Sequence, residues 1–496
     1  MSLSYFAETN AGIAELWVSD GTTAHKVTGF AGNPIQNLTV IGARVFFTVD
    51  DGVHGNELWV SDGTAAGTTL VSDIDPGATG SSPADLINVN GELFFAANDG
   101  THGLELWETD GTVAGTMMVK DVDPGSTGGF AGIPMVNING TVFFDATDGT
   151  HGVELWKSDG TAAGTVMVSD INPGATGSFP ASLTNLNGTL LFFADDGTHG
   201  NELWRSDGTT AGTSLVMDIN PGAGPSFTSG VFNVTTVNGT LFFMAQDASH
   251  GFELWKSDGT AAGTTMVADI NPGGASSSPQ FLTNVNGELF FTANDGTHGF
   301  ELWKSDGTSA GTQLVKDIFP GAVGSITSVF GPWANVNGTL FFVAADSAAD
   351  GFELWKSDGT AAGTVMVKDI VPGPGSSLPA WLTNVNGMLE FYAEDPLSST
   401  GWGLWKSDGT AAGTVEIATN VTAPSTITPI GFTPPPVVND LNGDSNADIL
   451  WRNDNGAMAE WLMNGTAIMQ SVTPTSGALP ISPDNTWTTQ AKPTIG

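Results

Sequence analysis

The clearest candidate for chemistry is a run of oxygen-bearing side chains near the C-terminal end, Asp-Leu-Asn-Gly-Asp-Ser-Asn-Ala-Asp, which begins at residue 440. Side-chain oxygens fall at positions 1, 3, 5 and 9 of this run, and position 7 can add a backbone carbonyl. Calcium takes about six to eight oxygen ligands at flexible distances, and a glycine at the bend lets such a loop close around one ion. The alternative is an Asx-rich turn without an ion. We predict a Ca²⁺ site, and its ligands would be Asp440, Asn442, Asp444, Asn446 and Asp448.

A second pattern combines histidine and glutamate in a repeated motif, Asp-Gly-x-His-Gly-x-Glu. Such a cluster could bind a cation, or contribute to a binding face, in each repeat. The simpler interpretation is a histidine that hydrogen-bonds within its own or a neighbouring turn, and a glutamate that caps turn amides or pairs with a lysine. Gly403 replaces the glutamate in the last repeat, and Asp350 and Thr400 replace the histidine in the last two. The candidate face consists of His54, His102, His151, His199, His250, His298, Glu57, Glu105, Glu154, Glu202, Glu253 and Glu301.

The same repetition argues against catalysis. An active site breaks the symmetry of a repeat protein, whereas each prominent histidine or carboxylate here recurs six to nine times. No nucleophile or acid and base pair can be placed, so we predict a non-catalytic protein without catalytic residues. The rival is a glycosidase or lyase with paired carboxylates, for which the insertions at Asp346 to Asp350 and Pro396 to Trp402 would be the place to look.

These residues belong to a repeat built around a Leu-Trp pair. Each unit contains Asn-Gly, Leu-Phe-Phe, the histidine motif, Glu-Leu-Trp, Ser-Asp-Gly-Thr and Asp-Ile, followed by a segment rich in Pro, Gly and Ser. Asn-Gly is typical of a two-residue hairpin, and the other glycine-rich segments form further turns. Each repeat of about 50 residues contains four short strands that are apolar on both faces. This pattern predicts a β-propeller rather than a β-solenoid. The tryptophans, which we expect in the core between blades, are Trp17, Trp59, Trp107, Trp156, Trp204, Trp255, Trp303, Trp355 and Trp405.

The blade number can be inferred from the units. The first unit lacks its first strand, which Thr426 to Phe432 could supply beside Tyr5 and Phe6, so that both chain ends share one blade. We therefore predict an all-β propeller of about nine four-stranded blades, with eight as the alternative. A small β unit would come after it at the C-terminal end.

Two known families resemble the two parts of the chain. The nine-fold Glu-Leu-Trp-x-Ser-Asp-Gly-Thr motif resembles the ELWxxDGT repeat proteins of bacteria, over residues 4 to about 432. This resemblance implies a large secreted or surface protein with a propeller. After Pro434-Pro435-Pro436, residues 440 to 448 and the strands beyond them resemble one FG-GAP or VCBS-type repeat, a family with calcium loops. We expect domains at 1–432 and 433–496.

Composition restricts the partners. Lys and Arg number 13 against 52 Asp and Glu, and the net charge of −39 opposes binding to nucleic acid or to an anionic membrane. There is no cysteine, no run of 18 apolar residues and no signal peptide at the first residues, so export would need another route. We expect a secreted or surface-attached propeller that acts in adhesion or ligand binding, with a polysaccharide or a protein as partner. The alternatives are a structural spacer of a matrix or envelope, and a polysaccharide-active enzyme.

Overall fold

The computed structural model describes residues 4–10, 13–19, 24–32, 35–125, 128–132, 134–227, 234–326, 333–346, 351–385, 388–394, 402–421, 449–452, 458–464 and 467–471. All helix-or-strand elements within these ranges are β-strands. Among the described residues, no helix has the length and apolar character that a membrane span requires.

Eight sheets contain four antiparallel strands each, paired in chain order as simple meanders. The first four sheets are β4 (Gln36–Ile41), β5 (Arg44–Asp50), β6 (Asn56–Ser61) and β7 (Thr69–Leu70); β8 (Ala84–Val89), β9 (Glu92–Asn98), β10 (Leu104–Thr109) and β11 (Met117–Lys120); β12 (Val136–Ile138), β13 (Thr141–Thr147), β14 (Val153–Ser158) and β15 (Val166–Ser169); and β16 (Ala181–Leu186), β17 (Thr189–Asp195), β18 (Asn201–Ser206) and β19 (Ser214–Met217).

The other four sheets repeat this arrangement. They are β20 (Val234–Val237), β21 (Thr240–Ala245), β22 (Glu253–Ser257) and β23 (Thr265–Ala268); β24 (Gln280–Val285), β25 (Glu288–Asn294), β26 (Phe300–Ser305) and β27 (Gln313–Lys316); β28 (Ala334–Val336), β29 (Thr339–Ala344), β30 (Glu353–Ser357) and β31 (Val365–Lys368); and β32 (Ala380–Val385), β33 (Met388–Glu394), β34 (Trp402–Ser407) and β35 (Val415–Val421).

The first hairpin of each sheet depends on the backbone freedom of Asn-Gly. Asn90 and Gly91, between β8 and β9, have φ values of 56° and 98°. A type I′ turn needs positive φ at both central residues, and Asn and Gly adopt this conformation at the lowest cost. The pairing of Val89 with Glu92 across this turn sets the register of the two strands.

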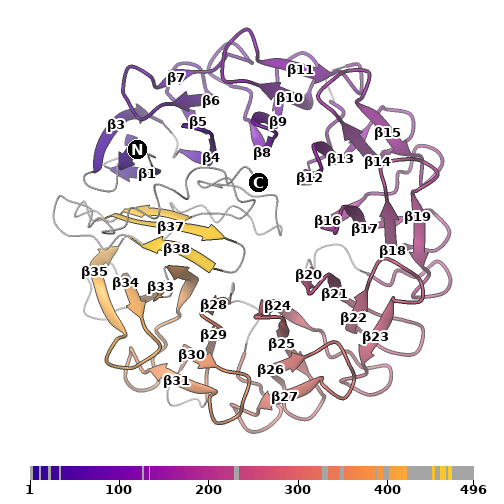
Figure 1. Cartoon of the computed structure of the whole chain (residues 1–496), viewed down its shortest axis with the longest axis vertical. Coiled ribbons are helices and arrows are strands. Elements are labelled where there is room, and N and C mark those ends of the chain that lie inside the picture. Colours follow the sequence, from indigo (N-terminus) through magenta and orange to yellow (C-terminus); the bar gives the residue numbers. More distant parts are fainter. Residues whose placement is uncertain are drawn as a thin grey trace.

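The sheets stand side by side around a ring, with the first strand of each sheet toward the centre and the fourth toward the outside (Figure 1). Successive phenylalanines fill the two spaces beside each sheet. Phe46 lies in one core cluster with Phe95 of the next sheet, whereas Phe47 lies in another with Leu16 of the preceding sheet. Because consecutive side chains of a strand point to opposite faces, Phe-Phe supplies both interfaces of a blade. The predicted all-β propeller is therefore confirmed.

Two three-stranded sheets lie where the ring closes (Figure 1). The first repeat forms β1 (Ser4–Asn10), β2 (Ile13–Ser19) and β3 (Ala24–Ala31), without the inner strand, as the sequence predicts. The C-terminal sheet consists of β36 (Ile449–Arg452), β37 (Met458–Asn464) and β38 (Ala467–Ser471). Strand β36 contacts β1, and both β37 and β38 contact β32. The segment Thr426 to Phe432, predicted to complete the first blade, lies outside the described residues.

Candidate functional site

The histidine turns, which join the second and third strands of six sheets, have one geometry. In each turn an aspartate three residues before the histidine accepts a hydrogen bond from the histidine backbone N–H. The same carboxylate lies 2.6 to 2.9 Å from the ring Nδ1. Because an ionised carboxylate only accepts, Nδ1 carries the proton of this bond. The pairs are Asp51 and His54, Asp99 and His102, Asp148 and His151, Asp196 and His199, Asp247 and His250, and Asp295 and His298.

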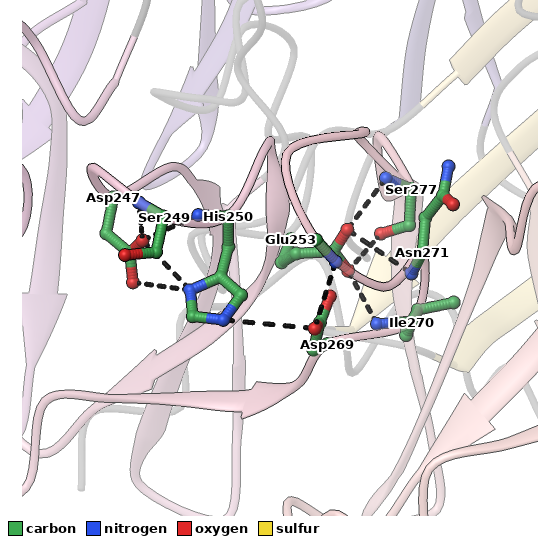
Figure 2. Close-up of polar contacts among 9 residues, drawn as sticks. Asp247, Ser249, His250, Glu253, Asp269, Ile270, Asn271 and Ser277 are labelled. Atoms are coloured by element: carbon green, nitrogen blue, oxygen red, sulfur yellow. Dashed lines mark hydrogen bonds and ion pairs between the residues drawn. The ribbon is translucent and has the colours of Figure 1, made fainter.

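A second aspartate comes from the start of the interblade link, the segment between the fourth strand and the next sheet, and its charge acts on each imidazole; among the described residues, only at His250 does it lie within 4 Å of the ring. In sheet β20–β23, His250 lies between Asp247 and Asp269, and its Nε2 is 3.8 Å from Asp269 Oδ2 (Figure 2). The hydrogen bond with Asp247, and then the charges of Asp269 and Glu253, raise the pKa of His250 above its ordinary value. The equivalent aspartates beside the other five histidines are Asp73, Asp121, Asp170, Asp218 and Asp317.

The repeated glutamate is buried at the start of the third strand and closes the interblade link. Glu253 Oε1 accepts hydrogen bonds from the backbone N–H groups of Asn271 and Ser277, at 3.4 and 2.9 Å. Its Oε2 accepts from the N–H of Ile270 at 2.8 Å and from the hydroxyl of Ser277 at 2.6 Å (Figure 2). With no exposed surface, this carboxylate contacts the protein's own backbone rather than an external ligand. Burial raises the pKa of the equivalent carboxyls in the seven sheets from β4–β7 to β28–β31, to about 7 for Glu105 and Glu301, although the hydrogen bonds oppose this shift.

The Ser-Asp-Gly-Thr turns between the third and fourth strands are also internally bonded. Asp306 Oδ1 accepts from the backbone N–H and the hydroxyl of Thr308, at 2.8 and 2.7 Å. These hydrogen bonds lower the pKa of Asp306. The Ser305 hydroxyl bonds that of Thr312 across the turn at 2.8 Å. The aspartate therefore shapes the turn, as Asx residues commonly do.

Sequence reasoning places the histidines and glutamates on one candidate face, but the structure distributes them over six sheets. Each glutamate points into the link, while each histidine stays at the turn. Within the described ranges, no group of three or more His, Cys, Asp or Glu side chains could hold a metal ion. The predicted calcium ligands, residues 440 to 448, lie outside these ranges, as do residues 347–350 and 395–401 of the two insertions.

Two groups of polar residues that the structure shows were not predicted from the sequence. One is the second aspartate, whose signal was the recurring Asp-Ile at the end of each repeat. The other is a set of lysines on the fourth strand that bond the next sheet. Lys316 Nζ donates to the carbonyl of Thr364 at 2.8 Å and lies 5.6 Å from the ring centre of Trp355. Lys120 and Lys368 make the same two contacts, each with the sheet that follows its own.

The comparisons with known proteins give structural matches only. No family model and no curated protein match the chain. A puromycin hydrolase is 15% identical with a TM-score of 0.32, over 74% of this chain and 59% of its own. A puromycin-hydrolyzing peptidase of Mycobacterium tuberculosis is 11% identical with a TM-score of 0.34, over 77% and 57%. A prolyl endopeptidase is 13% identical with a TM-score of 0.38, over 74% and 55%. The chain thus spans less than two thirds of each, and such identities indicate fold alone.

These matches correct one prediction from the sequence. We predicted a non-catalytic protein that acts in adhesion or ligand binding, because every prominent carboxylate and histidine is repeated. The matched structures are named as a hydrolase and as peptidases. The inference from symmetry was wrong because the regularity of a ring describes only the ring. It excludes no chemistry in the remainder of a protein. The matches themselves assign no activity to this chain.

Proposed function

We propose that the described chain is a rigid propeller framework that holds other parts of a protein in place and can do so within an enzyme. The observation that carries this proposal is the buried glutamate of the repeat. In sheets as far apart as β4–β7 and β28–β31, it bonds the amides of the interblade link. One side chain thereby fixes the segment that joins each blade to the next.

The remaining charged groups of the repeat support the same role. Basic side chains bridge neighbouring sheets, because Lys256 donates to Gly307 O and Lys356 donates to Gly409 O, each at 2.7 Å. The aspartates of the histidine turns and of the Ser-Asp-Gly-Thr turns bond their own turns. Lys120, Arg205, Lys316 and Lys368 make bonds equivalent to those of the two lysines, so six of the 13 basic residues join one sheet to the next.

Three further proposals rest on the sequence. We propose Ca²⁺ binding by the loop from Asp440 to Asp448, for its oxygen spacing. We propose an extracellular or cell-surface location, for the resemblance to ELWxxDGT repeat proteins. A polysaccharide or protein partner is compatible with the net charge of −39, which opposes nucleic acid.

Amide hydrogen exchange on the full chain tests the framework. We expect the N–H groups of Ile270, Ile318 and Ile370, which bond the buried glutamates, to exchange as slowly as those of the neighbouring strands. Exchange at the rate of an unstructured peptide would contradict the proposal. A parallel assay adds panels of peptides and polysaccharides. If His298→Ala abolished a hydrolytic activity and left the melting temperature unchanged, the turns would be catalytic rather than structural.

A further inference from the structure

The strongest unexplained feature is the pair of carboxylates on either side of the His250 imidazole, together with an equivalent second aspartate whose charge acts on each of the other five histidines. The two carboxylates come from different elements: one from the histidine turn and one from the start of the interblade link. In sheet β20–β23 they are Asp247, 2.9 Å from Nδ1 of His250, and Asp269, 3.8 Å from its Nε2 (Figure 2). The imidazole thus lies between the histidine turn and the interblade link.

The protonation state decides how many of these carboxylates the imidazole can bond. A neutral imidazole has one N–H, and Asp247 uses it at Nδ1. Its Nε2 then carries a lone pair that faces Asp269 Oδ2, an acceptor. An imidazolium has an N–H at both nitrogens, so it can donate to both aspartates, and a charged donor makes the stronger hydrogen bond.

We propose that the six histidine turns are proton-operated clasps, in which uptake of one proton by the imidazole joins the turn to the interblade link of the same sheet. In mild acid, the turn and the link of each of the six sheets would then be joined by the same hydrogen bond. The 3.8 Å separation of His250 Nε2 from Asp269 Oδ2 would shorten to that of a hydrogen bond. This goes beyond the framework role, because it makes the stiffness of the framework depend on pH.

The charged groups that face the imidazole favour the proton. Asp247 comes from the turn, Asp269 from the link and Glu253 from the third strand, and all three raise the pKa of His250. Asp269 Oδ2 also accepts a hydrogen bond from Gly273 N at 3.3 Å. Its Oδ1 is buried without a hydrogen-bond partner among the described residues, and the equivalent oxygen recurs in the other five sheets, from Asp73 to Asp317. A half-buried carboxylate with unused acceptor capacity gains from a nearby cation.

The chain contains its own comparison. In the last repeat Thr400 stands at the histidine position and Thr419 at the position of the second aspartate, so both halves of the clasp are missing together. The preceding repeat keeps Asp369 but has Asp350 in place of the histidine. Six sheets therefore keep both residues of the pair, and in sheet β20–β23 the two are already within 4 Å of each other.

The direction of the pKa shift sets the pH window. The pKa of each of these histidines is raised above the ordinary value of 6.5 by its turn aspartate. The stabilisation is therefore fully present below pH 6.5 and is lost as the pH rises through the raised value in the folded protein. The ring should melt at a higher temperature near pH 6 than near pH 8. This increase should be smaller when a clasp is removed by His250→Gln.

Titration of the histidine ring signals by NMR tests the contact in the intact chain. His250→Gln identifies its signal, and Asp269→Asn should lower the titration midpoint of His250 by about half a pH unit, because it removes one charge about 4 Å away. The other five midpoints should not move. Ser249→Ala, in the same turn but without a contact to the ring, is the matched control.

Two results would overturn the proposal. One is an unchanged midpoint of His250 in Asp269→Asn, and the other is a wild-type midpoint at or below 6.5. If Asp269→Asn does not fold, Asp317→Asn and His298 repeat the test in sheet β24–β27. A pH-dependent melting temperature without coupling between histidine and aspartate would point instead to the buried glutamates, since the raised pKa of Glu105 and Glu301 also makes the fold more stable in mild acid.

Discussion

Sheets β24–β27 and β32–β35 share one topology but differ in how they are joined to the next segment of the chain. In the first, Glu301 bonds Ile318 N at 3.0 Å and the Ser325 hydroxyl at 2.6 Å in the link. In the second, Gly403 stands at the glutamate position, and a Cβ there would meet the carboxylate of Glu416, which comes from β35. The fourth strand thus fills the place of the missing side chain.

This difference separates the residues that make a sheet from those that join sheets. Both sheets keep the Trp of the third strand and the hydroxyl pair across the next turn, Ser305 with Thr312 and Ser407 with Thr414. The glutamate that bonds the interblade link is lost, Glu301 being replaced by Gly403, and the second strand also differs, with Glu390 in place of Phe290. In the sequence, no further repeat of this type follows sheet β32–β35. The comparison teaches that strand order and blade joining are encoded separately.

The largest expected effect is at the glutamate staple, which is the buried glutamate with its hydrogen bonds to the interblade link. Glu301→Ala removes the acceptor of three hydrogen bonds and leaves the amides of Ile318 and Phe319 unsatisfied in a buried place. We expect a loss of about 3–5 kcal/mol in the free energy of unfolding, measured in urea. Glu301→Gln keeps an acceptor oxygen and should lose less.

The control for this change is Glu288→Ala in the same sheet. Glu288 is a partly exposed carboxylate that pairs with Lys304 at 3.1 Å. Its removal should cost no more than about 0.5 kcal/mol. Equal losses for the Glu301 and Glu288 variants would show that the buried hydrogen bonds do not join the blades.

A smaller effect sharpens the comparison from the other sheet. Gly403→Ala places a Cβ against the carboxylate of Glu416 and 3.1 Å from Trp405 Nε1. Because Glu416 can rotate away, we expect a loss of about 1–2 kcal/mol in unfolding free energy. The double variant Gly403→Ala with Glu416→Ala should be more stable than the sum of the single losses predicts. Additive losses would mean that Glu416 does not occupy the glutamate site.

The sequence predicts the ring far better than it predicts the joints. Asn-Gly, Phe-Phe and Ser-Asp-Gly-Thr act over a few residues, so their hairpins, interfaces and turns can be inferred from local chemistry. The partners of Glu253 lie 17 to 24 residues downstream in an irregular link, where no periodicity places them. One signal was available: Glu253 lies in a strand that is apolar and covered on both faces, so a carboxylate there needs buried partners. The calcium loop stays a prediction, because residues 440 to 448 lie outside the described ranges.

The smallest effect concerns the lysine bridge, which is present both between sheets β24–β27 and β28–β31 and between sheets β28–β31 and β32–β35. Lys316 donates to Thr364 O at 2.8 Å and lies over Trp355, and Lys368 donates to Thr414 O at 2.8 Å and lies over Trp405. Methionine would keep the apolar stem of the lysine and remove the donor and the charge. We expect Lys316→Met and Lys368→Met each to cost about 1 kcal/mol, since each loses one hydrogen bond and one cation–π contact. If the two losses agree, the lysine bridge works independently of the glutamate staple, which is present beyond Lys316 in sheet β28–β31 and absent beyond Lys368 in sheet β32–β35. A much larger loss for Lys368→Met would show instead that the lysine compensates where the staple is missing.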